Sequence, residues 1–385
     1  MQNLHKKIML IIFFFIIGMV PLLSLLTMPR EERAFSENEN RFLARFPQWS
    51  FDRFQDRKYM EEFENWANDR VFMRENWMML RNWTERLLGK TEVEGVFITD
   101  ERMVQAWRGY NEAAVNRNLT AMNDFAERHD VPVFFMLAPT AQEIYRDTLP
   151  ESASLASQKD FMKHCFELMP DITPIDILPD LERNSQRYLY YRTDHHWTSL
   201  GSYIAYTAAG QAMGFSPLEL NRFRIENASN SFLGTLFSLT LDRSLSPDII
   251  NIYTLSEGDP DVTVSVNKGT ETATHDTLYF REYLDVKDKY SVFIGTNAPI
   301  IEIESDLGGV EKRLLIFKDS FAHSLIPFLA KNYSHITVAD MRFINVDYNT
   351  FFDVSDFDAV LFMYNVITFS EDTNLVKLNA GKQER

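Results

Sequence analysis

Apolar runs and amphipathic stretches alternate along much of this sequence. Stretches with helical periodicity, such as 111–129 and 154–168, lie between short and continuous apolar runs. Such runs, bounded by polar residues, are typical of strands buried on both faces of a parallel sheet. The pattern predicts an α/β fold with a doubly wound, mostly parallel sheet and functional residues at the carboxyl ends of its strands. The apolar runs are 131–137, 313–317, 335–339 and 357–364, and 172–177 is expected to be a short strand.

Two other regions have different patterns. Residues 51–89 carry aromatic residues at helical spacing, among them Phe63, Trp66 and Trp77, which predicts two helices ending at Gly89. Between 225 and 304, Thr, Val, Tyr and Phe alternate with polar residues, which is typical of strands. We expect this second region to be a β-rich insertion within one large domain of residues 51–385.

The N-terminal segment is long and apolar enough to cross a membrane. Lys6 and Lys7 precede residues 8–28, which carry no charge. About 20 such residues span a hydrocarbon core of roughly 30 Å as a helix. A cleaved signal peptide is the alternative, but its apolar core is usually shorter and ends in a small-x-small site, which is not evident here. We expect an uncleaved anchor at 1–29 and a stalk at 30–50, with the chain beyond them outside the cytoplasm.

Composition narrows the possible classes of partner. An apolar fraction of 45% supports a sizeable packed core. The formal charge of −16 argues against nucleic acid as a partner, because a phosphate backbone needs a basic surface. Cys165 is the only cysteine, so no intramolecular disulfide can form.

The densest polar cluster of the sequence is Arg192-Thr193-Asp194-His195-His196-Trp197-Thr198. It allows three interpretations. Its side chains could cap the helix that begins near Ser199. Its aspartate and histidines could bind a metal, although ligands on adjacent residues converge poorly on one ion. Alternatively, a carboxylate here could orient an imidazole that activates a nucleophile elsewhere in the chain.

A second segment favours the acid–base interpretation. The apolar strand 313–317 is followed by Lys318-Asp319-Ser320 and then by a helix. A serine at this point lies at the carboxyl end of a strand, where the amides of the following helix stabilise negative charge. Ser320 could instead be a plain helix cap, but the pairing with an Asp-x-His segment favours a nucleophile.

These segments together resemble a known family. Asp194-His195-His196-Trp197 is the signature of the DHHW proteins, which resemble the SGNH-hydrolase-like proteins that O-acetylate alginate and other bacterial exopolysaccharides. The resemblance runs from about Phe63 to Thr368. It is carried further by Phe63-Glu64-Asn65-Trp66-Ala67-Asn68-Asp69-Arg70, Val96-Phe97-Ile98, Leu137-Ala138-Pro139-Thr140, Phe232-Leu233-Gly234-Thr235-Leu236, Tyr290-Ser291-Val292-Phe293-Ile294-Gly295 and Lys318-Asp319-Ser320.

The resemblance implies a site and an order of parts. Ser320, His196 and Asp194 would form the catalytic triad, and the serine strand would come late in the chain, in a circularly permuted motif order. Asn365 falls where the family has an oxyanion asparagine. The chain departs from the family at two positions: Lys318 stands where glycine is usual, and Arg342 follows the strand that normally supplies the second oxyanion donor. Arg342 and His195 are therefore further candidates for contact with the oxyanion or substrate.

The implied activity is serine-dependent transfer of an acyl group, most simply acetyl, to hydroxyls of a cell-surface or secreted polysaccharide. It requires no metal or organic cofactor. The acyl donor could be delivered by a multi-spanning membrane acyltransferase. Two alternatives stay open on the sequence: an esterase of the same fold, in which water is the acceptor, and a non-catalytic polysaccharide assembly protein.

Overall fold

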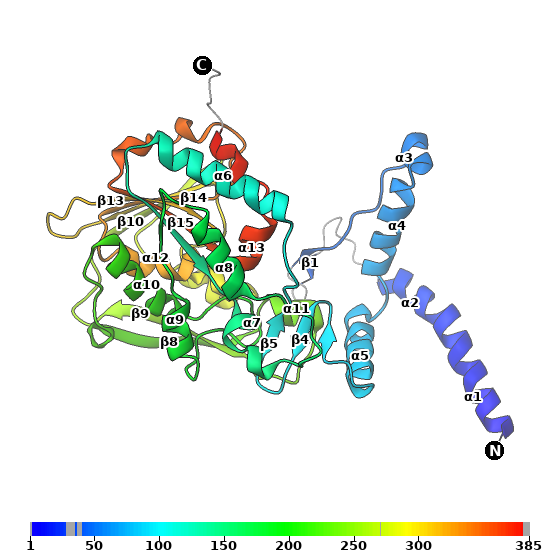
Figure 1. Cartoon of the computed structure of the whole chain (residues 1–385). Helices are drawn as coiled ribbons and strands as arrows, with labels where there is room; N and C mark the ends of the chain where they lie inside the picture. Colours follow the sequence, from blue (N-terminus) through cyan, green and yellow to red (C-terminus); the bar gives the residue numbers. More distant parts are fainter. Residues whose placement is uncertain (1, 28–34, 37–40, 270, 380–385) are drawn as a thin grey trace. The chain divides into compact units, whose positions relative to one another are not determined.

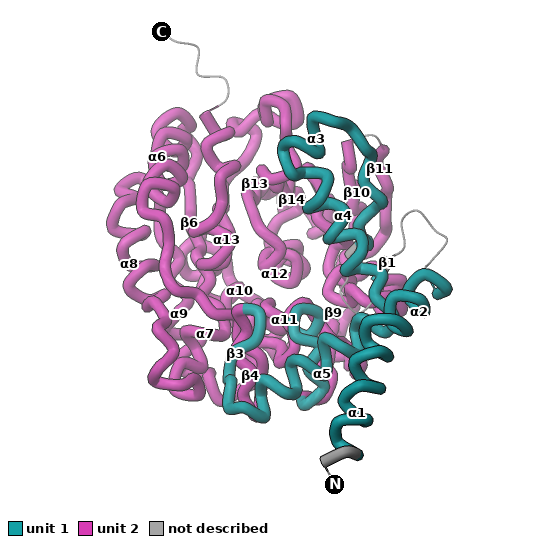
Figure 2. The backbone as a smooth tube through the Cα atoms, turned by 90° about the vertical axis from the view of Figure 1, so that its right-hand side faces the viewer, with its two compact units in different colours: residues 1–94, 237–244 teal, residues 95–236, 245–385 magenta. Residues whose placement is uncertain are grey.

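A computed structural model describes residues 2–27, 35–36, 41–269 and 271–379. The chain forms two compact units, one of residues 1–94 and 237–244 and the other of residues 95–236 and 245–385 (Figure 2). The first unit contains the N-terminal helices. The second contains the large sheet and every residue that the sequence nominates for a site.

A large sheet lies at the centre of the second unit (Figure 1). It has eight strands in the order β11-β10-β12-β14-β13-β15-β6-β7. Strands β14, β13, β15, β6 and β7 are parallel to one another. The sheet is therefore mostly parallel, as the pattern of apolar runs predicts. The parallel strands are β6 (Val133–Ala138), β7 (Thr173–Pro174), β13 (Arg313–Lys318), β14 (His335–Ala339) and β15 (Ala359–Asn365).

Helices cover both faces of this sheet because alternate residues of each strand point to opposite sides. Phe134 and Met136 of β6 pack in one core cluster with residues of α10 and α12. Phe135 and Leu137 pack in a second cluster with residues of α6 and α8. The helices of the second unit are α6 (Glu112–Arg128), α7 (Ala141–Ile144), α8 (Gln158–Glu167), α9 (Leu178–Arg183), α10 (Ser199–Met213), α12 (Ala322–Leu329) and α13 (Val366–Glu371).

The β-rich character expected between 225 and 304 is present, and three of its strands extend the large sheet. β12 (Ile300–Ser305) pairs antiparallel with β14, β10 (Val262–Asn267) with β12, and β11 (Thr272–His275) with β10. β8 (Phe223–Phe232) and β9 (Asp248–Leu255) form a separate antiparallel pair. Helix α11 (Thr235–Thr240) lies between them in the sequence.

One local prediction was wrong, and one strand is shorter than expected. The segment 51–89 forms three helices rather than two, because Arg57 and Met73 adopt left-handed backbone conformations that interrupt it. The short strand expected at 172–177 is present, but it pairs over only two residues, since Pro174 has no N–H to donate and β7 lies at the sheet edge. The three helices are α3 (Phe51–Gln55), α4 (Lys58–Asp69) and α5 (Arg74–Leu87); short strands follow at β3 (Glu92–Val93), β4 (Val96–Ile98) and β5 (Met103–Gln105).

The N-terminal apolar segment is helical. α1 (Gln2–Phe14), a π-helical segment (Phe15–Met19) and α2 (Val20–Thr27) follow one another without a break. Residues Leu4–Thr27 are long and apolar enough to cross a membrane, and none of this span is buried in the protein. Met28 and residues 29–34 lie outside the described residues, as do 37–40 of the expected stalk. Of that stalk, β1 (Phe35–Ser36) pairs with β2 (Arg41–Phe42).

Shortening a central core side chain should destabilise the second unit. Leu361 lies in β15 with no exposed surface, so Leu361→Ala removes buried methyl groups and leaves a cavity. We expect it to lower the free energy of unfolding by about 2–5 kcal/mol. Leu168→Ala, at a 42% exposed leucine, should change it by less than about 0.5 kcal/mol. Urea denaturation measures both variants, and equal effects would contradict this core assignment.

Candidate active site

The serine nominated by the sequence lies in a turn at the carboxyl end of β13. Asp319 and Ser320 follow the strand, and α12 begins two residues later. Asp319 fixes this turn: its carboxylate accepts hydrogen bonds from the Phe321 N–H at 2.8 Å and from the backbone and side-chain nitrogens of Asn365 at 2.7 and 2.6 Å. Ser320 itself is partly exposed. Its backbone N–H has no hydrogen-bond acceptor among the described residues.

The histidine and aspartate come from the loop between α9 and α10. An isolated antiparallel bridge between Tyr190 and Trp197 closes this loop, and Thr198 caps α10 by accepting from the Gly201 N–H. The Trp197 indole N–H donates to the Phe321 carbonyl oxygen at 3.0 Å. This hydrogen bond joins the histidine loop directly to the serine turn.

Ser320, His196 and Asp194 form one hydrogen-bonded line. The Nε2 atom of His196 lies 2.7 Å from Ser320 Oγ, and its Nδ1 atom lies 2.6 Å from Asp194 Oδ1. Asp194 Oδ1 also accepts from the His196 backbone N–H at 2.9 Å, and Oδ2 accepts from the Thr235 N–H at 2.7 Å. The carboxylate is thus held by bonds to both of its oxygens.

Two neighbours of the loop explain why it adopts this shape. The buried Asp248 carboxylate accepts from the Arg192 and Thr193 backbone N–H groups and from the Thr193 hydroxyl. Gly234 packs against Asp194 so closely that a Cβ atom at Gly234 would lie 2.3 Å from the Asp194 side chain. Any larger residue at Gly234 would displace the carboxylate.

The His196 ring is also fixed by stacking. The Tyr290 ring lies parallel to it, with the ring centroids 3.8 Å apart and an interplanar angle of 10°. The Tyr290 hydroxyl donates to the Ser320 carbonyl oxygen at 3.2 Å and lies 3.1 Å from Ser324 Oγ. One side chain therefore positions both the imidazole and the serine turn.

Charge at the site is unevenly distributed. Burial alone would raise the pKa of Asp194, but the two adjacent histidines and the hydrogen bonds from His196 and Thr235 hold it below its usual value. Asp194 is therefore an anion beside His196. Burial raises the pKa of Asp319, which has backbone and amide donors around it but no directly bonded cation among the described residues.

The remaining nominated residues lie in different settings. The side-chain amide of Asn365 donates to Asp319 and to Thr368 Oγ1, and its oxygen caps α13. Both side-chain N–H groups of Asn365 therefore already have hydrogen-bond acceptors in this conformation. Arg342 forms a bidentate ion pair with Asp340: its Nε and Nη2 atoms lie 2.8 and 2.7 Å from the two carboxylate oxygens. The His195 side chain is 26% exposed, and its Nδ1 atom lies 3.8 Å from Asp194 Oδ1.

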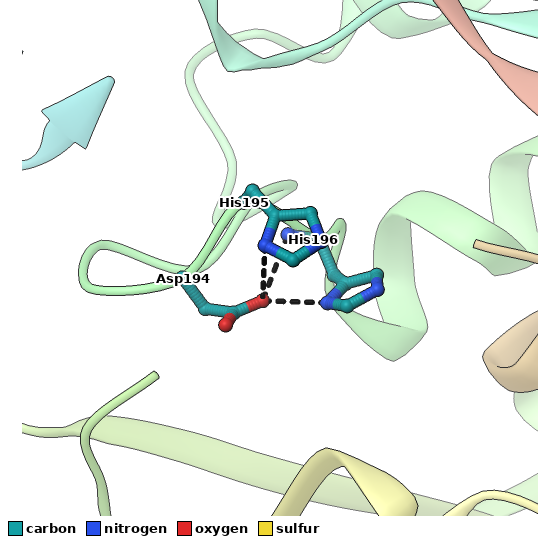
Figure 3. A group of neighbouring side chains, drawn as sticks. All are labelled: Asp194, His195 and His196. Carbon is teal, nitrogen blue, oxygen red and sulfur yellow. Dashed lines mark hydrogen bonds and ion pairs between the residues drawn. The ribbon is translucent and has the colours of Figure 1, made fainter. Parts of the chain in front are cut away.

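Asp194, His195 and His196 are close enough to one another to be considered as metal ligands (Figure 3). However, both ring nitrogens of His196 already have partners, and both oxygens of Asp194 accept from N–H groups. A metal ion would have to break the line to Ser320 or the bond to Asp194. The donor set is therefore better matched to proton transfer than to metal binding.

The sequence matches the DHHW protein family over residues 110–339. The chain belongs to the DHHW family. This match includes the histidine loop and the serine turn. Among curated proteins, none matches the sequence.

Several solved structures have a fold similar to that of this chain. A DHHW family protein from Eubacterium siraeum shares 25% identity over 75% of this chain and 96% of its own, with a TM-score of 0.65. Bacillus cereus PatB1, also solved with a sulfonyl adduct, shares 21% identity over 74% of this chain and 99% of its own, with a TM-score of 0.64. The O-acetyltransferase domain of Pseudomonas putida AlgJ shares 15% identity over 74% of this chain and 99% of its own, with a TM-score of 0.45.

Beneath the serine turn, this DHHW protein has a buried polar network that sequence reasoning missed. The Lys318 ammonium group has no exposed surface and donates to Asn297 Oδ1, His323 Nε2 and Asp340 Oδ2 at 2.7, 2.7 and 3.2 Å. Burial lowers the pKa of Lys318 to about 8. The only signal in the sequence was the departure from glycine at Lys318. Tyr290 gave no signal of its own beyond lying in a matched segment.

The histidine in this network should make stability depend on pH. Burial, followed by the Lys318 charge, holds the pKa of His323 well below 6.5, so the folded state keeps the ring neutral. The unfolded chain binds a proton there as the pH falls below 6.5, and this stabilises the unfolded state. The contribution of His323 to stability is therefore present above pH 6.5 and is lost on acidification.

His323→Gln should remove this dependence while keeping an acceptor for Lys318. The stability difference between wild type and variant should fall by up to about 1.4 kcal/mol for each pH unit below about 6.5. Urea denaturation of both proteins between about pH 7 and about pH 5 measures it. A difference that does not change with pH would show that His323 binds its proton as readily in the folded protein as in the unfolded chain.

Proposed function

We propose that this DHHW protein transfers an acyl group, most simply acetyl, from a donor to hydroxyls of a cell-surface or secreted polysaccharide, with Ser320, His196 and Asp194 as its triad. The observation that supports this most is the hydrogen-bonded line from Ser320 Oγ through His196 to Asp194. It lies at the carboxyl end of a parallel sheet, where α/β proteins carry their sites.

The first half of the reaction acylates the serine. With its Nδ1 proton donated to Asp194, His196 has a free electron pair on Nε2 that accepts the Ser320 hydroxyl proton. Ser320 Oγ attacks the acyl carbonyl carbon, and a tetrahedral intermediate forms. His196 then gives the proton to the leaving group as the bond between it and the acyl carbon breaks.

The second half moves the acyl group to the acceptor. His196 removes a proton from an acceptor hydroxyl, whose oxygen attacks the acyl-serine carbonyl. The bond to Ser320 Oγ breaks, and His196 returns the proton to it. In both halves His196 becomes an imidazolium stacked on Tyr290, and the face of an aromatic ring stabilises such a cation.

The Ser320 N–H is the first candidate for binding the oxyanion, because it has no other acceptor among the described residues. Asn365 could join it only by releasing Asp319 or Thr368. Arg342 and His195, both partly exposed, are candidates for contact with the substrate. Loss of one oxyanion donor typically costs ~10²–10³ in rate.

We place the chain with the SGNH-hydrolase-like proteins in a circularly permuted order, since the serine strand β13 follows the histidine loop in sequence. The β-rich segment 225–304 is then an insertion that partly joins the sheet. Leu4–Thr27 is a single-pass anchor with the second unit outside the cytoplasm.

Substitutions in the triad should separate an enzyme from a binding protein. Ser320→Ala should lower turnover of a small acetyl ester by at least about 10³-fold, and His196→Ala nearly as much, because triad members act together. His195→Ala should cost far less. Ser231→Ala, at an exposed serine of β8, is the matched control and should leave turnover unchanged. Turnover that survives Ser320→Ala would end the serine mechanism.

The anchor has a test of its own. Full-length protein with a C-terminal tag should stay in the membrane fraction after alkaline carbonate extraction, because a spanning helix of about 20 apolar residues is not released by it. Intact-mass measurement should find the N-terminal segment still attached. Tagged protein released into the medium, with a new N-terminus after the apolar run, would mean that the segment is a signal peptide.

A further inference from the structure

Helix α5 of the first unit exposes its apolar side. Four large apolar residues repeat every three or four positions along it, which places them on one face, and Met73 directly precedes the helix. Together these residues form what we call the α5 stripe, and their exposed fractions are 51%, 41%, 48%, 60% and 66%. Asn76 and Thr84 lie on the same side, so the stripe carries no charge. In order, the stripe residues are Met73, Trp77, Leu80, Trp83 and Leu87.

The opposite face of α5 carries Asn82 and Arg86 together with the partly buried Met78, and it is the face that packs within the unit. Asn82 is buried and donates to the carbonyl oxygen of Thr240. Arg86 donates to Asp242 at 2.9 Å and to Ser244 at 3.1 Å. The helix is thus held by hydrogen bonds and an ion pair on its inner side, while its most exposed apolar side chains lie on the outer side, unlike the buried apolar face of an ordinary surface helix.

A hydrogen bond fixes where α5 begins. The Phe72 N–H, two residues before the helix, donates to Ser24 Oγ at 2.8 Å. Ser24 lies three residues before the end of the apolar span Leu4–Thr27. A helix of that length is about 36 Å long, which exceeds the roughly 30 Å of hydrocarbon. The last turn of the span, and with it the start of α5, would therefore lie at the level of the lipid headgroups.

We infer that α5 lies in the outer interface of the membrane, with the α5 stripe on the lipid. This rests on the proposed anchor and is independent of the acyl-transfer chemistry. Tryptophan and leucine on one uncharged face, attached to the end of a spanning helix, match an interfacial amphipathic helix. The Trp77 indole N–H donates to the Phe72 carbonyl oxygen, so that ring presents an apolar surface. Because the chain is acidic overall, the contact is apolar rather than electrostatic.

Spin-label accessibility in the full chain tests this directly. The protein is reconstituted in phosphatidylcholine vesicles, with Cys165→Ala as background and one cysteine at Leu80 or Trp83 carrying a nitroxide. Leu10, 55% exposed in α1, is the reference in lipid, and Thr120, exposed on α6, is the reference in water. Oxygen, which partitions into lipid, and a water-soluble nickel chelate are the two relaxing agents.

At Leu80 and Trp83 we expect a ratio of oxygen to nickel accessibility close to that at Leu10 and several-fold above that at Thr120. Trp77→Gln with Trp83→Gln should lower the ratio at Leu80 toward the Thr120 value.

Ratios at Leu80 and Trp83 equal to that at Thr120 would place the stripe in water and overturn the inference. Labels immobilised and shielded from both agents would overturn it in favour of a protein partner. A water-exposed label at Leu10 would overturn the anchor as well, whereas loss of ester turnover would bear only on the proposed chemistry.

Discussion

The hydrogen bond from the Trp197 indole to the Phe321 carbonyl oxygen joins two segments on which the whole site depends. One is a loop without regular structure; the other is a turn at the end of a strand in the middle of the large sheet. A loop alone would not keep an imidazole at a fixed hydrogen-bonding distance, here 2.7 Å, from a hydroxyl. With Trp197 bonded to the serine turn and Tyr290 stacked on His196, the loop takes its position from the sheet.

Buried charged side chains that pair with one another lie next to the site. Asp340, at the end of β14, binds both Lys318 of β13 and the Arg342 guanidinium. Asp319 joins the serine turn to the end of β15. Three neighbouring strand ends are therefore connected by carboxylates. Removing one partner would leave an unpaired buried charge, which is costly, so this network ties the position of Ser320 to the packing of the sheet.

Much of this arrangement follows from sequence patterns. The runs that became β6, β13 and β14 were recognisable because strands buried on both faces are continuously apolar. Ser320 and His196 were recognisable because a polar turn after such a strand and an Asp-x-His loop are uncommon together. The division of 51–89 into three helices could not be predicted, since left-handed residues such as Arg57 have no distinct sequence signal. The role of Asn365 as a helix cap could not be predicted either, because it depends on the local position of Thr368.

The most direct test of the central claim is to look for the acyl-enzyme. Full-length protein mixed with an excess of an activated acetyl ester and quenched with acid within one turnover should yield an acetylated peptide containing Ser320. Mass spectrometry should place the acetyl group on that serine and should find none in His196→Ala. Turnover of the ester with the acetyl group on another residue, or with no acetylated Ser320 at any time, would contradict the account.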